Sequence, residues 1–377
     1  GHLALAPVCE APELDFLVSE GSFGDTGGPP LITTAANSVL AHGKAWITIA
    51  ESRYDEAGLV NGLISGGLVA QESYQPDKLK PALRSLPAQL DRSSISEIAL
   101  IVDDISAAYT SCGPELVKPL LSDQRVSLSL LGAPVDVWTL DDLMQGAVTG
   151  YKLYIFADCF YLDSEWRKQL SDLLAQQPCT ALWIYAPGAI DQNIGGRTMK
   201  DLTGLTIVPW AERRQGDAEL PTRVDKGLLQ VKVGEGYTYG APVPLSPRFI
   251  CVDDKADARG TLAGTSFAGL AMKDLGTLKS IWSAAPHLPA TLLREIAEEA
   301  DVHLYSDNAD GVYANRSLIM VRAAADGERV IKLPKLAQVY DLADGKPVGK
   351  KSSEFRVRLK AGQIGTYYYG EGPLVER

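Results

Sequence analysis

The sequence predicts an α/β protein that is built on a doubly wound parallel sheet and continues into an all-β region. Residues 93–305 alternate short apolar strands with helical segments, and four consecutive β-α units favour a parallel sheet with helices on both faces. Residues 306–377 instead hold short strands separated by turn dipeptides, which is typical of an antiparallel β domain. Residues 1–92 form a third segment that is rich in glycine and proline.

Length and charge narrow the classes of function. The chain has 377 residues, which is enough for two or three domains, and 46% of them are hydrophobic, which excludes global disorder. Its 47 acidic and 36 basic side chains give a net charge of −11, so neither nucleic acid nor an anionic membrane surface is expected as a partner. No apolar run is long enough for a transmembrane helix and no signal-peptide pattern is found, so a cytoplasmic location is expected.

The first segment, residues 1–92, contains two runs that are typical of buried parallel strands. They cover residues 14–18 and 45–50, and each is followed closely by a glutamate, Glu20 in the first case and Glu51 in the second. Leucines at helical spacing between residues 77 and 90 indicate a helix whose length is limited by two prolines.

The middle segment, residues 93–305, supplies the predicted parallel sheet. Asp163 is the predicted N-cap of the helix that follows the third strand. Residues from about 210 to 260 break the β-α rhythm and predict a β-rich insertion, after which a helix is expected over residues 289–300. The predicted strands of this segment cover residues 98–102, 135–138, 151–156, 180–185 and 302–305.

The last segment, residues 306–377, is predicted to form a small β-sandwich. Asp326-Gly327 and Asp344-Gly345 are hairpin signals. The predicted strands cover residues 317–321, 328–333, 337–340, 354–359 and 366–369.

Cysteine and histidine usage predicts no structural metal and no disulfide framework. The five cysteines form an odd set without a C-x-x-C pair, and there are only four histidines. The glycine-rich stretches match neither a phosphate-binding nor a dinucleotide-binding motif, so no cofactor is expected.

Several stretches of the middle and last segments resemble one known family. The chain from residue 93 onward is similar to the part that follows the catalytic barrel in glycoside hydrolase family 42 β-galactosidases. The resemblance implies a flavodoxin-like or class I glutamine-amidotransferase-like domain that builds a trimer, so a homo-oligomer is expected. The stretches that carry it are SEIALIVDD (96–104), YKLYIF (151–156), LWIYAPGAID (182–191), HLYSD (303–307), VYANRS (312–317) and VYD (339–341).

The first segment resembles the end of that family's barrel. Residues 42–53 are similar to the strand that carries the catalytic nucleophile, and Glu51 falls at its position. Retaining glycosidases need two carboxyl groups about 5–5.5 Å apart, one as nucleophile and one as acid/base. In the family the acid/base lies on an earlier strand, which this sequence does not contain, and about 92 residues are available where a barrel needs about 250. An incomplete, barrel-derived segment is therefore expected.

Other candidate residues are weaker. Glu20 is a second carboxylate at a strand end, and Ser266 lies in GTSFA, which lacks the final glycine of a nucleophile elbow; His287 and Asp274 would nominally complete its triad. Cys159 follows the strand at 151–156, whereas a glutaminase nucleophile would follow the strand that ends at residue 185, so no glutaminase activity is expected. Trp210 is expected to pack, with sugar stacking as an alternative.

Three hypotheses of function follow. The first is a β-galactosidase-like glycoside hydrolase with Glu51 as the candidate nucleophile, with the missing acid/base leaving activity open. The second is a non-catalytic oligomerisation or carbohydrate-binding module. The third is an ester or lactone hydrolase whose site is not visible in the sequence.

Overall fold

The computed structural model describes most of the chain, in two compact units. The first unit comprises Gly1–Leu5, Ala99–Gln124 and Thr139–Pro289, and the second comprises Ala6–Ile98, Arg125–Trp138 and Ala290–Arg377. Within the described residues, no helix has the length and apolar character needed to cross a bilayer. The described residues are 12, 14–20, 36–49, 55–70, 86, 90–109, 116, 118–191, 196–210, 227–370 and 374.

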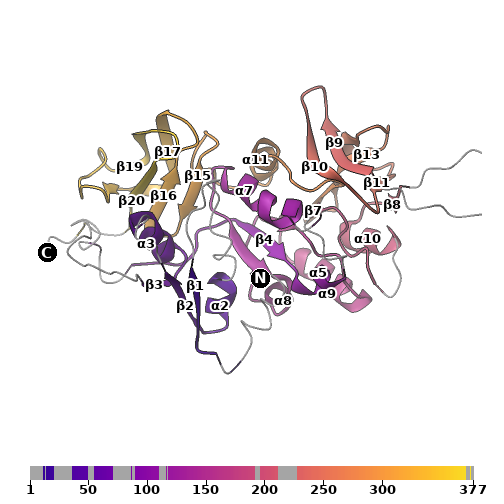
Figure 1. Ribbon diagram of the computed structural model, residues 1–377, viewed down its shortest axis with the longest axis horizontal. Helices are drawn as coiled ribbons and strands as arrows, with labels where there is room; N and C mark the ends of the chain where they lie inside the picture. The colour runs from indigo at the N-terminus through magenta and orange to yellow at the C-terminus, as the bar shows by residue number, and fades with distance from the viewer. Residues whose placement is uncertain are drawn as a thin grey trace, which may run out of the picture. The chain divides into compact units, whose positions relative to one another are not determined.

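The core of the first unit is a sheet that is parallel at one end and antiparallel at the other (Figure 1). From β10 to β4, its strands follow the order β10-β9-β12-β13-β14-β7-β6-β4. β14 pairs with β7 in parallel and with β13 in antiparallel, so the change of direction occurs at β14. The parallel strands are β4 (Ile98–Val102), β6 (Leu153–Phe156), β7 (Cys179–Ile184) and β14 (Leu278–Ser283).

The parallel strands are buried on both faces, as their continuous apolar runs predict. Phe156 and Trp183 are partners in the β6–β7 register, and their rings stack at 4.2 Å. The Trp183 indole donates to Ser280 Oγ on β14 at 3.0 Å, so this large buried side chain keeps a hydrogen-bond partner.

Short helices join the parallel strands, and one begins at the predicted cap. Asp163 is the N-cap of α9 (Ser164–Leu174), and its Oδ1 accepts from Trp166 N at 2.9 Å. The predicted helix between residues 77 and 90 falls largely outside the described residues. The remaining helical elements before the insertion are α5 (Asp104–Ala108), η4 (Lys118–Ser122), α7 (Asp123–Ser129), α8 (Leu140–Met144) and α10 (Gly196–Thr203).

The predicted insertion is β-rich, and its strands extend the sheet from β14 outward. β11 lies off this path, where it pairs with β8 and β13. The strands are β8 (Ile207–Pro209), β9 (Gly227–Val233), β10 (Tyr237–Leu245), β11 (Phe249–Cys251), β12 (Asp257–Leu262) and β13 (Ala268–Asp274).

The second unit contains a three-stranded parallel sheet from the first segment. β1 (Phe16–Glu20) pairs with β2 (Ala45–Ile49), which also pairs with β3 (Leu68–Ala70). The helices between these strands are α2 (Ala36–Ala41) and α3 (Asp55–Ile64). Asp55 and its neighbour Glu56 therefore open a helix.

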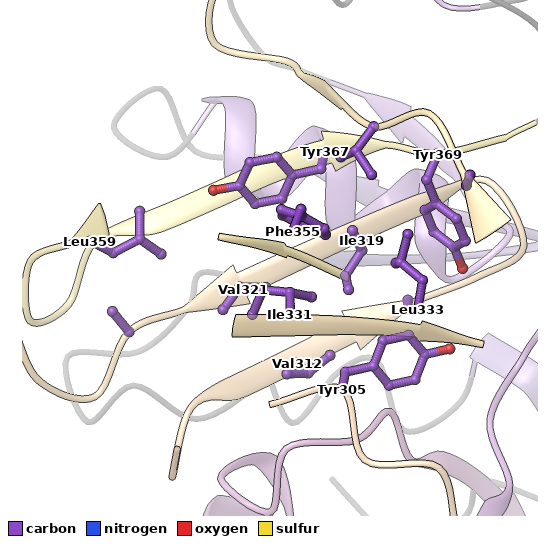
Figure 2. Packing of buried hydrophobic residues seen from close by; sticks show 14 residues of the cluster. Tyr305, Val312, Ile319, Val321, Ile331, Leu333, Phe355, Leu359, Tyr367 and Tyr369 are labelled. Carbon is purple, nitrogen blue, oxygen red and sulfur yellow. The ribbon is translucent and has the colours of Figure 1, made fainter. Parts of the chain in front are cut away.

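The C-terminal strands of the second unit form two antiparallel sheets around one core (Figure 2). The four-stranded sheet has the order β15-β16-β20-β18, and β17 pairs with β19. Ile319 and Val321 of the first sheet share the core with Ile331 and Phe355 of the second. The strands are β15 (Gly311–Ala314), β16 (Leu318–Arg322), β17 (Gly327–Ala337), β18 (Tyr340–Asp341), β19 (Ser352–Leu359) and β20 (Ile364–Tyr368).

The first and last segments of the chain share part of a core within this unit. Val60 of α3 packs with Leu318, Met320 and Tyr368 of the four-stranded sheet. Asn315 Nδ2 donates to the carbonyls that end α3, at 3.2 Å for Leu63 and 3.3 Å for Ile64. The first and last segments belong to the same compact unit. The predicted domain boundaries at residues 92 and 305 therefore stay a prediction.

Two local predictions were wrong. Residues 302–305 follow α11 (Ala290–Glu299) but form no strand, because their backbone donors bond to separate partners, for example His303 N to Glu97 Oε2 and Tyr305 N to the Gly132 carbonyl. Asp326-Gly327 is not the turn of a hairpin, because β16 and β17 belong to different sheets.

The predicted α/β class with a large, partly parallel sheet is confirmed.

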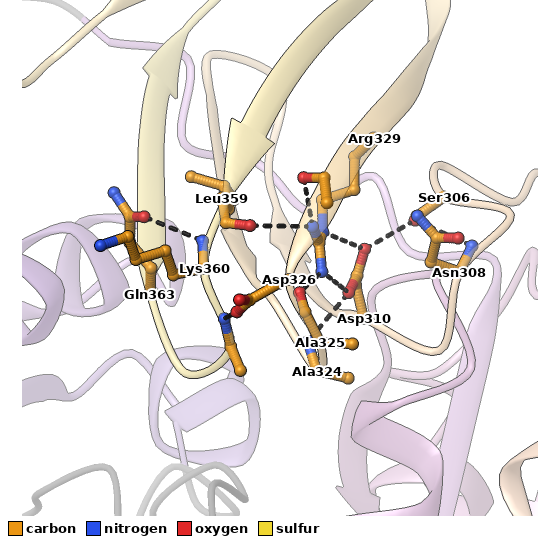
Figure 3. Close-up of polar contacts among 12 residues, drawn as sticks. Ser306, Asn308, Asp310, Ala324, Ala325, Asp326, Arg329, Leu359, Lys360 and Gln363 are labelled. Carbon is orange, nitrogen blue, oxygen red and sulfur yellow. Dashed lines mark hydrogen bonds and ion pairs between the residues drawn. The ribbon is translucent and has the colours of Figure 1, made fainter.

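The turn at Gly327 is built around a buried arginine (Figure 3). Arg329 donates to the carbonyls of Gly327, Ala325 and Leu359 and forms two bonds with the Asp310 carboxylate. Asp310 also accepts from Ala324 N and Ser306 Oγ, so both charged groups have several partners.

Candidate functional site

The predicted glycosidase carboxylates belong to the parallel sheet of the second unit. Glu20 is the last residue of β1, and its register partner is Ile49, the last residue of β2. The carboxyl ends of these two strands therefore lie side by side, which is where barrel-type sites are built. Glu51 lies two residues beyond Ile49 and is outside the described residues. Its role as a nucleophile, and that of Glu20 as a second carboxylate, stay predictions.

The described residues bring a different pair of carboxyl groups together in the first unit. Asp103 directly follows β4, and Asp158 follows the neighbouring strand β6. Asp103 N donates to Asp158 Oδ1 at 2.9 Å, and the two residues are only 3% and 5% exposed. The Asp103 carboxylate also caps the first turn of α5, where it accepts from Ile105 N and Ser106 N at 3.1 Å each.

Burial perturbs both carboxyl groups of this pair. Desolvation raises the pKa of Asp103 to about 6, against the lowering effect of its hydrogen bonds to Ser106 and Ile105. Desolvation also raises the pKa of Asp158 well above the ordinary value, and the nearby Asp103 and Asp104 carboxylates add to the rise. Sequence reasoning missed this pair: Asp103 was recognised as a strand end, but Asp158 is 55 residues away along the chain.

Cys159 is in an environment opposite to that of a nucleophilic thiol. The side chain is 1% exposed, and desolvation raises the pKa of its thiol well above the ordinary value, with Asp103 and Asp158 adding to the rise. A nucleophilic cysteine instead needs access to solvent and a neighbouring positive charge. The structure therefore agrees with the expectation that Cys159 is not a glutaminase nucleophile.

A glutaminase nucleophile would lie at the end of β7, and this chain has a tyrosine there. Tyr185 has φ +65°, a left-handed conformation that is strained for a side chain of this size. Its backbone N–H donates to Ser283 O at 2.8 Å and its carbonyl accepts from the Trp282 indole at 2.9 Å. The buried phenol donates to Pro247 O at 2.7 Å. These contacts fix Tyr185 in place, and its hydroxyl is bound to the protein.

The nominal Ser266 triad is not assembled. Ser266 is exposed in the turn before β13, as the sequence indicated, whereas Asp274 is the last residue of that strand. A seven-residue strand at about 3.3 Å per residue separates the two by roughly 20 Å. Asp274 Oδ1 instead accepts from Gly276 N at 2.8 Å. Ser266 is therefore an ordinary turn residue.

Trp210 is half-buried beside an exposed aromatic ring. Its ring lies 5.1 Å from that of Phe267, tilted by 54°, and Phe267 is 36% exposed. The pair gives the insertion one aromatic surface feature, which suits packing and also suits contact with a sugar ring. Within the part of the chain that the structure describes, no group of three His, Cys, Asp or Glu side chains is placed to hold a metal ion.

Comparison with known proteins shows what fold this chain has. No family model and no curated protein sequence matches it. The β-galactosidase from Bacillus circulans sp. alkalophilus is similar in structure, with a TM-score of 0.65 and 13% identity, over 97% of this chain and 61% of that one. A polyextremophilic β-galactosidase from the Antarctic haloarchaeon Halorubrum lacusprofundi has a TM-score of 0.52 and 12% identity, over 78% of this chain and 42% of that one.

The two matches cover 97% and 78% of this chain, but only 61% and 42% of the neighbours, which is less than two thirds of each. At this identity the likeness concerns the fold. The resemblance inferred from the sequence is therefore confirmed at that level: this chain folds like one part of β-galactosidases of known structure.

Proposed function

We propose that this chain is a glycoside hydrolase-related protein of the β-galactosidase-like type, with Glu51 as its candidate nucleophile. The observation that carries the proposal is the structural likeness to a β-galactosidase over 97% of the chain. In the sequence Glu51 follows Ile49, the last residue of β2, by two positions, and Ile49 is the register partner of Glu20 at the end of β1. This supports a role for Glu51 at the carboxyl edge of a parallel sheet. Hydrolysis with retention would require Glu51 to attack the anomeric carbon while a second carboxyl group protonates the leaving oxygen.

The finer fold assignments belong to the same proposal. We infer that residues 93–305 form a flavodoxin-like, class I glutamine-amidotransferase-like domain, and that residues 306–377 form a β-sandwich. The parallel neighbours β14, β7 and β6 support the first, and the single core between two antiparallel sheets supports the second. Assembly into a trimer is proposed from the resemblance to the family.

A chromogenic β-galactoside assay with matched variants tests the catalytic proposal. Chromophore release by the purified chain should be lost in Glu51→Gln, because an amide cannot form the glycosyl-enzyme ester. Glu56→Gln, five residues further on, is the control and should keep the activity of the unaltered chain. Full activity in Glu51→Gln would exclude Glu51 as the nucleophile.

A non-catalytic carbohydrate-binding module is the second candidate, favoured by the exposed ring of Phe267 beside the half-buried ring of Trp210. It predicts no hydrolysis by any variant, together with retardation of the chain in a galactan-containing native gel that Phe267→Ala removes. Retardation that is unchanged in Phe267→Ala would exclude this surface. Light scattering measures the assembly, and a monomer at all concentrations would count against the trimer.

A further inference from the structure

The buried carboxyl pair of the first unit connects two segments that are far apart in the sequence. Asp103 joins the end of β4 to α5, and Asp158 begins the segment that leads from β6 toward α9. Asp103 N donates to Asp158 Oδ1 at 2.9 Å, which is the first link between the segments.

A second link passes through Ser106. The Ser106 hydroxyl donates to Asp103 Oδ2, and Ser106 Oγ in turn accepts from Tyr161 N at 2.8 Å. The carboxyl latch, by which we mean Asp103, Ser106, Asp158 and Tyr161, is therefore a continuous hydrogen-bond chain from the first turn of α5 to the segment after β6. Other hydrogen bonds hold the segment after β6 without involving the latch: Gly188 N donates to Cys159 O, and Ile190 N donates to Phe160 O.

The carboxyl groups of the latch have other acidic side chains as neighbours. Asp104 on α5 and Asp141 on α8 raise the pKa values of Asp158 and Asp103 respectively, and the two latch carboxyl groups are close enough to repel each other. The thiol of Cys159 is a further titratable group beside the pair. Two ionised carboxylates here would place like charges close together in a buried site.

We propose that the carboxyl latch is a proton-dependent device: it is closed while the Asp103–Asp158 pair holds a proton and loosens the segment after β6 from α5 when the pair gives its protons to solvent. Opening exposes the carboxylates to water, which solvates the charge that the closed latch cannot. The device uses only these four residues and does not depend on glycosidase activity.

The sign of the effect follows from linkage. The native pKa of Asp103, about 6, lies above the ordinary value of 3.8, so the closed form is favoured most below pH 3.8 and loses that advantage as pH rises through 6. If opening restores the ordinary pKa, the opening equilibrium constant should increase about 50-fold between pH 4 and pH 7.

Hydrogen exchange of single amides in the full chain tests the proposal. After correction for the intrinsic pH dependence of exchange, we expect protection of the Ser106 and Tyr161 amides to fall about 50-fold from pH 4 to pH 7. Asp103→Asn keeps an oxygen for the cap and removes one titrating group, so its protection should change much less, and the double variant with Asp158→Asn should be flat. Asp163→Asn, at the half-exposed cap of α9, is the matched control and should behave as the unaltered chain does.

An infrared measurement on the unaltered chain keeps the test decisive if an Asp158 variant does not fold. We expect a protonated-carboxyl absorption to persist at pH 6–7, where ordinary aspartates are ionised, and to weaken in Asp103→Asn. Absence of that absorption above pH 5, or equal pH dependence of the Tyr161 amide in the unaltered chain and Asp103→Asn, overturns the proposal.

Discussion

Arg329 and Asp310 form an ion pair inside the C-terminal part of the second unit, with Nε 3.0 Å from Oδ2 and with side chains that are only 3% and 0% exposed. Each partner also bonds to backbone groups of the turns around it, so the pair ties Ala324, Gly327 and Leu359 to one point (Figure 3).

Breaking this pair should be costly, because the remaining charge would be buried without a counter-charge. For Asp310→Asn we expect a loss of about 3–5 kcal/mol in the free energy of unfolding, measured by urea denaturation. Glu328→Gln removes the partner of Arg356 in a pair that is 62% exposed on both sides, and it should leave stability within error. Similar midpoints for the two variants would contradict the importance of burial here.

A second prediction concerns Gly132, which lies in a tight approach of two segments. Its φ is +89°, and a Cβ at this position would lie 2.6 Å from Ser306 O and 2.9 Å from an Arg294 guanidinium nitrogen. Gly132→Ala should therefore lose more stability than conformational strain alone explains, by about 1–3 kcal/mol. Gly146→Ala is the matched control: φ is +82°, but a Cβ would meet nothing within 4 Å. It should cost about 1–2 kcal/mol. Equal thermal shifts for the two variants would refute the packing argument.

A third prediction concerns the reactivity of Cys159. Burial keeps the Cys159 thiol away from an alkylating reagent, and its raised pKa lowers the fraction that is present as the reactive thiolate. At a pH below the pKa of the thiol, each further unit of pKa lowers that fraction about tenfold. Native protein treated with iodoacetamide at pH 8 should show almost no label on Cys159 by peptide mass spectrometry. The same residue in urea is the control and should label rapidly. Labelling of native Cys159 at the rate seen in urea would show that the thiol is accessible.

Much of the first unit could be predicted from local sequence. The apolar runs of β4, β6 and β7 are buried on both faces, so each run is short, continuous and easily recognised. Asp163 was predicted as a cap because capping depends on a carboxylate and a backbone N–H three residues away.

The misses involve interactions between distant residues. Residues 302–305 have the composition of a strand, but their backbone N–H groups bond to groups outside any sheet. His303 N donates to the Glu97 carboxylate, and Tyr305 N donates to the Gly132 carbonyl. Asp326-Gly327 has the sequence of a hairpin turn, yet the strands on either side pair with other partners. The Asp103–Asp158 pair was invisible for the same reason, because only the adjacency of β4 and β6 brings the two side chains together.

The position of β14 has a consequence for the order in which the chain can fold. Leu278 pairs with Cys179, so the two strands are separated by 278 − 179 = 99 residues of sequence. While the chain is being synthesised, the free edge of β7 must wait for the whole insertion before it gains its partner. Closing so long a loop slows folding, and it leaves an apolar strand edge exposed to other chains in the meantime. The insertion therefore lengthens the period in which the nascent protein is vulnerable to aggregation, and a chain truncated before residue 278 would keep that edge permanently open.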